Sequence, residues 1–212
     1  NIEAAQQEIA TMSGADRIRV QELDLTDFRS IAAASREIKE TEGSVDVLLN
    51  NAGVMAQKER EETSQGLEMQ FGTNHVGHHY LTRSLLPVIN RGGRIVTVAS
   101  TAHTMGDIDV SNLNYTPGVS DRKYSPWGAY GQSKLANILF AKGLQDRLNE
   151  SDRADVKSVS LHPGVISTPL WKHNNFLVRA ASKLFSDKNV DQGAATNVFC
   201  CLVEPSAFEG GE

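Results

Sequence analysis

The spacing of apolar positions along the chain changes between two periods, and this predicts alternating helices and strands. Apolar residues recur every three or four positions in five windows, which are predicted as helices: 1–11, 26–42, 64–89, 129–148 and 190–203. Short runs rich in β-branched and aliphatic residues are predicted as strands: 17–24, 45–50, 93–99 and 156–161. The segment 101–126 is polar and irregular, and a further helical segment is expected around 171–185.

This alternation predicts an α/β protein with a doubly wound parallel sheet of Rossmann type, because parallel strands need helical crossovers. Since no repeat or low-complexity linker divides the chain, we expect a single domain over residues 1–212. None of the 17 glycines forms a Gly-x-Gly-x-x-Gly loop between a strand and a helix. The chain also opens on a helix without a strand before it. We therefore expect the N-terminal βαβ portion with its Gly-rich loop, and the last strand, to be missing from these residues.

Composition narrows the class of protein. With 40% hydrophobic and 22% charged residues, the chain matches an ordinary globular protein. Its net charge of −5 argues against nucleic acid or an anionic membrane surface as a partner. No apolar run reaches the roughly 18 residues of a transmembrane helix, although an anchor or targeting peptide upstream stays open. Cys200 and Cys201 are adjacent within an apolar run, which favours free thiols in a reducing intracellular compartment, cytoplasmic or organellar.

Candidate chemistry lies at the ends of the predicted strands and at the start of one helix. Tyr130 and Lys134 are four residues apart on the helix 129–148, so their side chains share a face. An ammonium group beside the tyrosine favours its phenolate. Lowering a tyrosine pKa from about 10 to about 7 corresponds to roughly 4 kcal/mol, and such a tyrosine can exchange protons with a substrate. Ser100 follows the strand 93–99, at the sheet edge where α/β proteins bind ligands. Taken alone, the Tyr–Lys pair could equally be a solvated helix pair.

Several blocks in a fixed order give these residues a context. Together they resemble the short-chain dehydrogenase/reductase family, in particular its retinol-dehydrogenase-like branch, and the resemblance runs from residue 1 to about residue 211. The blocks are LDLTD (23–27), LLNNAG (48–53), NHVGHHYLT (74–82), GRIVTVAS (93–100), AYGQSKLANILF (129–140) and HPGVISTPL (162–170).

The resemblance implies four catalytic residues. Tyr130 would be the general acid and base, Lys134 would assist it, and Ser100 would donate to the substrate oxygen. Asn74 would interrupt a helix turn and hold a water that leads protons to the lysine. His75, His78 and His79 share a helix face, but no companion carboxylate or HExxH pattern joins them, so we expect packing or interface roles and no metal site.

The resemblance also implies a nicotinamide cofactor, with NADP(H) favoured over NAD(H). Asp24 and Leu25 would meet the adenine, and the loop Asn51, Ala52 and Gly53 would line the adenosine ribose. Tyr130 and Lys134 would face the nicotinamide end, with Lys134 binding the ribose hydroxyls. The turn after the last strand would hold the carboxamide and phosphate through Pro163, Gly164, Ile166 and Thr168.

The implied function is hydride transfer between the cofactor and a carbonyl compound or a primary or secondary alcohol. The apolar residues of 169–185 would form a lid that favours a retinoid-, steroid- or lipid-like substrate; a surface helix packed on its own domain explains them equally well. The alternatives are a catalytically silent binding or regulatory protein on the same fold, or an inactive partial gene product. We expect the 212 residues alone to be inactive and to bind dinucleotide poorly. A homodimer is left open.

Overall fold

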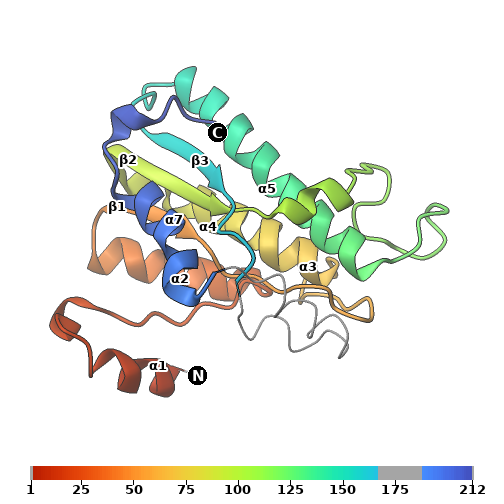
Figure 1. Ribbon diagram of the computed structural model, residues 1–212, viewed down its shortest axis with the longest axis horizontal. Helices are drawn as coiled ribbons and strands as arrows, with labels where there is room; N and C mark the ends of the chain where they lie inside the picture. Colours follow the sequence, from red (N-terminus) through yellow and green to blue (C-terminus); the bar gives the residue numbers. More distant parts are fainter. Residues whose placement is uncertain (1, 167–187, 212) are drawn as a thin grey trace.

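Three parallel strands form the sheet at the centre of the protein (Figure 1). The computed structural model describes residues 2–166 and 188–211. In these ranges the strands β1 (Val45–Asn50), β2 (Ile89–Val98) and β3 (Lys157–Leu161) lie in the order β1-β2-β3. Leu48 pairs with Ile95 and Val96 pairs with Val159. All three strands therefore end at one edge of the sheet.

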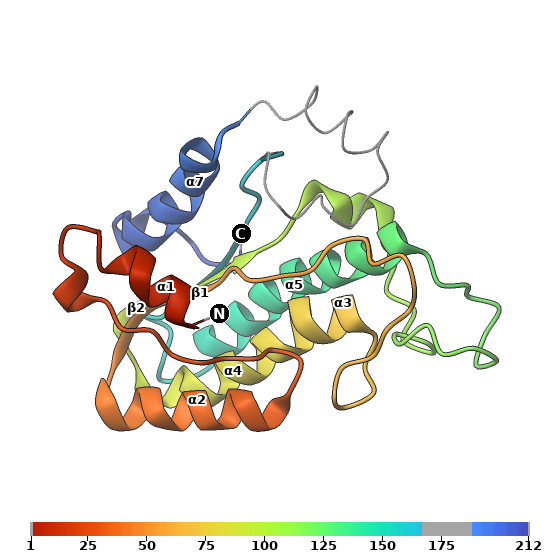
Figure 2. The same cartoon turned by 90° about the horizontal axis from the view of Figure 1, so that it is seen from below.

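Helices cover both faces of this sheet, as Figure 2 shows. One face carries α2 (Phe28–Thr41), α4 (His78–Leu85) and α5 (Pro126–Asn149), and the opposite face carries α7 (Val190–Leu202). The helix α1 (Ile2–Ile9) precedes them near the N-terminus. The expected α/β fold with a parallel sheet is confirmed for the described residues.

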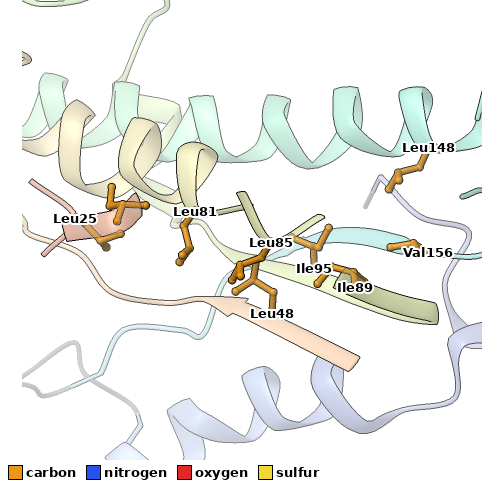
Figure 3. Close-up of a cluster of buried hydrophobic side chains, with 9 residues drawn as sticks. Leu25, Leu48, Leu81, Leu85, Ile89, Ile95, Leu148 and Val156 are labelled. Atoms are coloured by element: carbon orange, nitrogen blue, oxygen red, sulfur yellow. The ribbon is translucent and has the colours of Figure 1, made fainter. Parts of the chain in front are cut away.

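Alternate residues of each strand point to opposite faces, and each face has its own apolar core. Under α4 and α5, the core contains Leu48, Leu85 and Ile95 together with Val156 (Figure 3). Under α7, the core is made by Val96, Val98, Val159, Leu161 and Cys200. Because helices pack on both faces of the sheet, the strands and their carboxyl ends are held in position.

The segment 17–24 is not a strand, contrary to the sequence prediction. A 3₁₀ turn at Ala15–Arg17 leads into extended chain without ladder hydrogen bonds. A strand exists only where a neighbour supplies those bonds, and none of the described residues pairs with this segment. Ile18 and Leu23 are consequently 43% and 38% exposed.

The helix expected from residue 26 begins two residues later. Asp27 is its N-cap, and its carboxylate accepts from the Arg29 N–H at 2.9 Å. Thr26 instead donates its hydroxyl to Asp24 at 2.7 Å. At the other end, Gly43 follows the helix with φ of 71°, the left-handed conformation that ends helices and favours glycine.

The long helix expected over 64–89 is divided and shorter. It starts at α3 (Met69–Phe71), where the Glu68 carboxylate accepts from two backbone N–H groups, then continues as a π-helical turn η2 (Gly72–Gly77) and as α4. A 3₁₀ turn η3 (Leu86–Val88) contains Pro87, which has no N–H to continue the helix. The chain therefore enters β2 at Ile89, four residues before the predicted strand.

The remaining short elements flank the sheet. A 3₁₀ helix η4 (Thr101–Met105) directly follows the β2 strand end, and η6 (Pro205–Ala207) follows α7. No helix among the described residues is long and apolar enough to cross a membrane.

Candidate functional site

A pocket of about 840 Å³ opens at the carboxyl ends of the strands, where parallel α/β sheets bind their ligands. Its walls come from four parts of the chain: residues 51–55 after β1, residues 98–105 after β2, the first turns of α5, and residues 162–166 after β3. The fold thus gathers segments that are more than 100 residues apart in the sequence.

Tyr130 and Lys134 line this pocket from helix α5. Ser125 caps the helix, since its side chain accepts from the Gly128 N–H at 3.2 Å, and Pro126 begins the first turn. The Lys134 amine lies 5.7 Å from the centre of the Tyr130 ring. Both side chains are buried, and the Lys134 Nζ donates to the Val98 carbonyl at 2.9 Å. The lysine is therefore anchored to the end of β2 beside the tyrosine.

Ser100 lies opposite Tyr130 at the start of η4. Its hydroxyl oxygen accepts from the Ala102 N–H at 3.2 Å and caps this short helix. A side-chain hydrogen bond between Ser100 and Tyr130 favours the ionised form of the phenol. The two hydroxyl groups that could face a substrate oxygen are therefore next to each other.

Burial shifts the pKa of both ionisable groups in the pocket. It lowers the pKa of Lys134 to about 8, because a buried ammonium loses its hydration. It also raises the pKa of Tyr130, and the bond with Ser100 opposes that rise. Desolvation of the phenol is therefore the larger effect in the protein alone, and a tyrosine pKa lowered jointly by Lys134 and an oxidised nicotinamide stays a prediction.

Asn74 holds the loop after β1 through hydrogen bonds of its side chain to Val54. It lies in the π-helical turn, so the expected interruption of the helix at this residue is observed. Its side chain accepts from the Val54 N–H at 2.8 Å and donates to the Val54 carbonyl at 2.9 Å. The backbone carbonyl oxygen of Asn74 lies 3.0 Å from Nδ1 of His78. Asn74 therefore fixes the loop after β1, which forms one wall of the pocket.

The loop after β1 could hold part of a cofactor. Asn51, Ala52 and Gly53 are exposed and line the pocket. A Cβ atom on Gly53 would lie 2.9 Å from the Asn74 side-chain oxygen and 3.8 Å from the Lys134 amine. The absence of that atom leaves a groove beside a buried cation, which suits the flat, hydroxyl-rich nucleoside of a dinucleotide.

The opposite wall is the turn after β3. Pro163, Gly164 and Ile166 line the pocket there. Gly164 has φ of 91°, and a Cβ atom would lie 2.7 Å from the Lys188 side chain. Glycine is therefore favoured at this turn on conformational grounds, because the flexible Lys188 side chain could move away from a Cβ atom but the backbone conformation would stay strained.

Two predicted cofactor residues do not reach the pocket. The Asp24 carboxylate accepts from the backbone N–H and hydroxyl of Thr26, and the Leu25 side chain packs in the core under α4. Neither lines the pocket. Thr168 and the expected lid at 169–185 lie outside the described residues.

The apolar side of the pocket was not predicted from the sequence. Met55, Met105 and Trp127 line it, and the Trp127 ring lies 6.1 Å from the Tyr130 ring in an edge-on arrangement. Trp127 could have been found, because it precedes Tyr130 by three positions on one helix. Met55 and Met105 carry no sequence signal, since only the fold brings their loops together. Thr101, Ala102 and Thr104, which follow Ser100 directly, line the pocket as well.

The three histidines near Asn74 take part in packing. His75 and His79 contact Phe140 with ring centres 6.1 and 5.2 Å apart, and His78 is buried against the Asn74 carbonyl. In the part of the chain that the structure describes, no group of three metal-ligating side chains occurs.

Comparisons with known proteins find similarity to dehydrogenases. Residues 1–176 match the family model described as short chain dehydrogenase. Human retinol dehydrogenase 11 is 39% identical over 206 residues, covering 95% of this chain and 62% of that protein. Mouse polyprenol dehydrogenase is 35% identical over 207 residues, covering 93% of this chain and 60% of that protein. The chain thus spans about three fifths of the length of these relatives.

Solved structures show the same fold. An uncharacterized protein from Mycobacterium Paratuberculosis is similar with a TM-score of 0.76 and 35% identity, covering 100% of this chain and 66% of that one. A short chain dehydrogenase from Burkholderia cenocepacia, solved in complex with NADP, is similar with a TM-score of 0.71 and 21% identity, covering 99% and 79%.

Proposed function

The chain belongs to the short-chain dehydrogenase family, and from this premise we propose that it carries the catalytic site of an oxidoreductase. The reaction is hydride transfer between a nicotinamide cofactor and an alcohol or carbonyl compound. The observation that carries the proposal is the convergence of Tyr130, Ser100 and the buried Lys134 amine on one pocket.

Each of these side chains has a distinct task at the reacting oxygen. In alcohol oxidation, the Tyr130 oxygen takes the hydroxyl proton of the substrate, and in carbonyl reduction it returns that proton. Ser100 donates a hydrogen bond to the same substrate oxygen and holds its developing charge. The nicotinamide, when bound, accepts or delivers the hydride at the substrate carbon and, when oxidised, adds a positive charge that favours the Tyr130 phenolate.

Lys134 and the two loops hold the cofactor. The Lys134 amine retains protons beyond the one given to Val98, and these can donate to ribose hydroxyls. The loop Asn51–Gly53 would line the adenosine ribose, and the turn Pro163–Ile166 would hold the nicotinamide carboxamide; both segments line the pocket. We favour NADP(H) over NAD(H), on the resemblance of the sequence blocks to the retinol-dehydrogenase-like branch.

The substrate is proposed to have a large apolar body. Met55, Met105 and Trp127 give the pocket an apolar side next to the reacting hydroxyl groups. Two relatives are named as dehydrogenases of retinol and of polyprenol, which supports this class of substrate.

A catalytically silent binding protein is the second candidate. It needs the pocket but has no chemical use for an acid–base pair within it. The presence of Asn74, Ser100, Tyr130 and Lys134 in one connected site favours the enzyme.

The test is the variant Tyr130→Phe in the intact protein that carries this chain, assayed with NADP(H) and NAD(H). We expect kcat to fall at least about a hundredfold, the usual loss for a general acid–base, while cofactor affinity measured by calorimetry stays within about twofold. Tyr80→Phe is the matched control, because Tyr80 packs against Phe28 on the far side of α4. Retention of more than about a tenth of kcat in Tyr130→Phe would overturn the acid–base role of Tyr130, whereas dinucleotide binding without any turnover of the wild type would support the silent protein.

A further inference from the structure

Behind Lys134, a line of polar contacts leads away from the pocket into the space between α5 and η2. The Val98 carbonyl accepts from Lys134 Nζ at 2.9 Å and from the Asn137 amide nitrogen at 3.1 Å. A carbonyl oxygen has two lone pairs, so both are used. Asn137 is 1% exposed and lies three residues after Lys134 on α5. The same carbonyl therefore holds both side chains.

The orientation of the Asn137 amide follows from this contact. The Val98 carbonyl can only accept, so the amide nitrogen must face it and the amide oxygen must point the other way. That oxygen lies 3.1 Å from Nδ1 of His75. Because an amide oxygen can only accept, His75 must carry its proton on Nδ1.

Packing holds the His75 ring in place for this bond. Its centre lies 5.2 Å from the Phe71 ring and 6.1 Å from the Phe140 ring. Burial lowers the pKa of His75 to about 4, and the neighbouring His79 and His78 act in the same direction. The neutral ring has one N–H group, and the bond to Asn137 uses it.

We propose that His75 is a positioning residue for Lys134: it fixes the Asn137 amide, and this amide and the lysine amine together share the Val98 carbonyl. The proposal rests on the proposed function, in which Lys134 serves at the pocket. Without the His75 donor, the Asn137 amide oxygen loses its partner, and the bond to the Val98 carbonyl is the remaining contact of the amide in this line. The amide is then held less firmly, and the Val98 carbonyl and the lysine bound to it can shift.

The ionisation of Lys134 reports on this arrangement. The groups that face it are Tyr130 on its own helix and His78 on α4, whose pKa burial lowers to about 4. A less firmly held Asn137 donor leaves more of the Val98 carbonyl to the ammonium and lets the lysine side chain move toward the open pocket. Both effects favour the charged amine, so the pKa of Lys134 should rise.

The experiment compares His75→Leu with His75→Asn, whose amide nitrogen can take the place of Nδ1. We expect His75→Leu to raise the pKa of Lys134 by roughly half a unit or more, measured by ¹³C NMR of its ε carbon in the intact protein. In the intact protein, kcat should fall roughly tenfold with little change in KM, because the lysine is misplaced and substrate contacts are kept. His75→Asn should restore both values, and the control His79→Leu should change neither.

A lysine pKa and kcat that stay at their wild-type values in His75→Leu would overturn the proposal. So would equal defects in His75→Leu and His75→Asn, because a general packing role does not depend on a donor at this position. If His75→Leu fails to fold, His75→Gln replaces it; its amide extends one carbon further and should show the defects of the leucine variant. The NMR measurement needs no turnover, so it separates this proposal from the proposed function, which fails if the wild type shows no turnover or if Tyr130→Phe stays active.

Discussion

The Asn74 amide donates to the Ser133 hydroxyl at 3.0 Å and so joins the π-helical turn to helix α5 one residue before Lys134. The Ser133 hydroxyl in turn donates to the backbone carbonyl of Tyr130 at 2.7 Å, so Asn74 is connected to the helical turn that carries the tyrosine. Asn74 also bonds both backbone groups of Val54 in the loop after β1. One buried amide therefore sets the distance between the loop proposed to hold the cofactor and the helix that carries the acid–base pair.

Replacing this amide should damage stability and catalysis together. Asn74→Leu leaves the Val54 N–H and carbonyl without their partner, and each buried polar group left unpaired costs about 1–3 kcal/mol. We expect the free energy of unfolding to fall by roughly 2–5 kcal/mol in urea titrations, and kcat to fall with it. Ser133→Ala is the control: it removes one contact of Asn74 but keeps both bonds to Val54, so its loss should be less than half as large. Equal losses in the two variants would contradict the central role of Asn74.

A methyl group on Gly53 should weaken cofactor binding. The Cβ of Gly53→Ala would meet the Asn74 side-chain oxygen at 2.9 Å and would fill the groove beside Lys134. We expect the dissociation constant for dinucleotide to rise at least roughly tenfold, since displacement of a pocket wall by about 1 Å has effects of this size. Gly92→Ala is the control and should leave cofactor affinity unchanged, because its Cβ meets no atom and it lies far from the pocket. Its φ of 71° adds local strain only. Calorimetry that shows equal affinity in Gly53→Ala and the wild type would mean that this loop does not contact the cofactor.

The buried lysine should make stability depend on pH in the alkaline range. Its pKa is lowered from 10.5 to about 8 in the folded protein, so between these values the unfolded chain binds more protons than the folded one. The free energy of unfolding therefore rises with pH from about 8 to 10.5. Below pH 8 the lysine is protonated in both states, so the full cost of burying its charge remains. The shift corresponds to roughly 3 kcal/mol as an upper estimate.

Lys134→Met removes this titration while keeping much of the side-chain volume. The free energy of unfolding, measured in urea, should rise between pH 7.5 and 10.5 by up to about 3 kcal/mol more in the wild type than in Lys134→Met. Lys142→Met serves as control, because Lys142 is an exposed residue of the same helix. Parallel pH profiles for the wild type and Lys134→Met would show that the amine is solvated and not buried.

Much of the fold could be predicted from the sequence, because local periodicity reflects which face of an element is buried. The strands at β1 and β3 and the helices α2, α5 and α7 agree with the predicted elements to within a few residues. The segment 17–24 has a strand-like composition, yet composition alone cannot supply hydrogen-bond partners, and the described residues give it none. The start of β2 and the π-helical turn also depended on contacts between distant residues, which local propensity does not encode.

By itself, the sequence determined which residues could carry chemistry, since Tyr130 and Lys134 share a helix face by spacing and Ser100 ends a strand. Only the tertiary structure decided how these residues are held. It tied Lys134 to Val98, Asn74 to Val54 and His75 to Asn137, and it placed Met55 beside Trp127 on the pocket wall. It also decided the direction of the pKa shifts, because desolvation depends on all the atoms packed around a group and not on its neighbours along the chain.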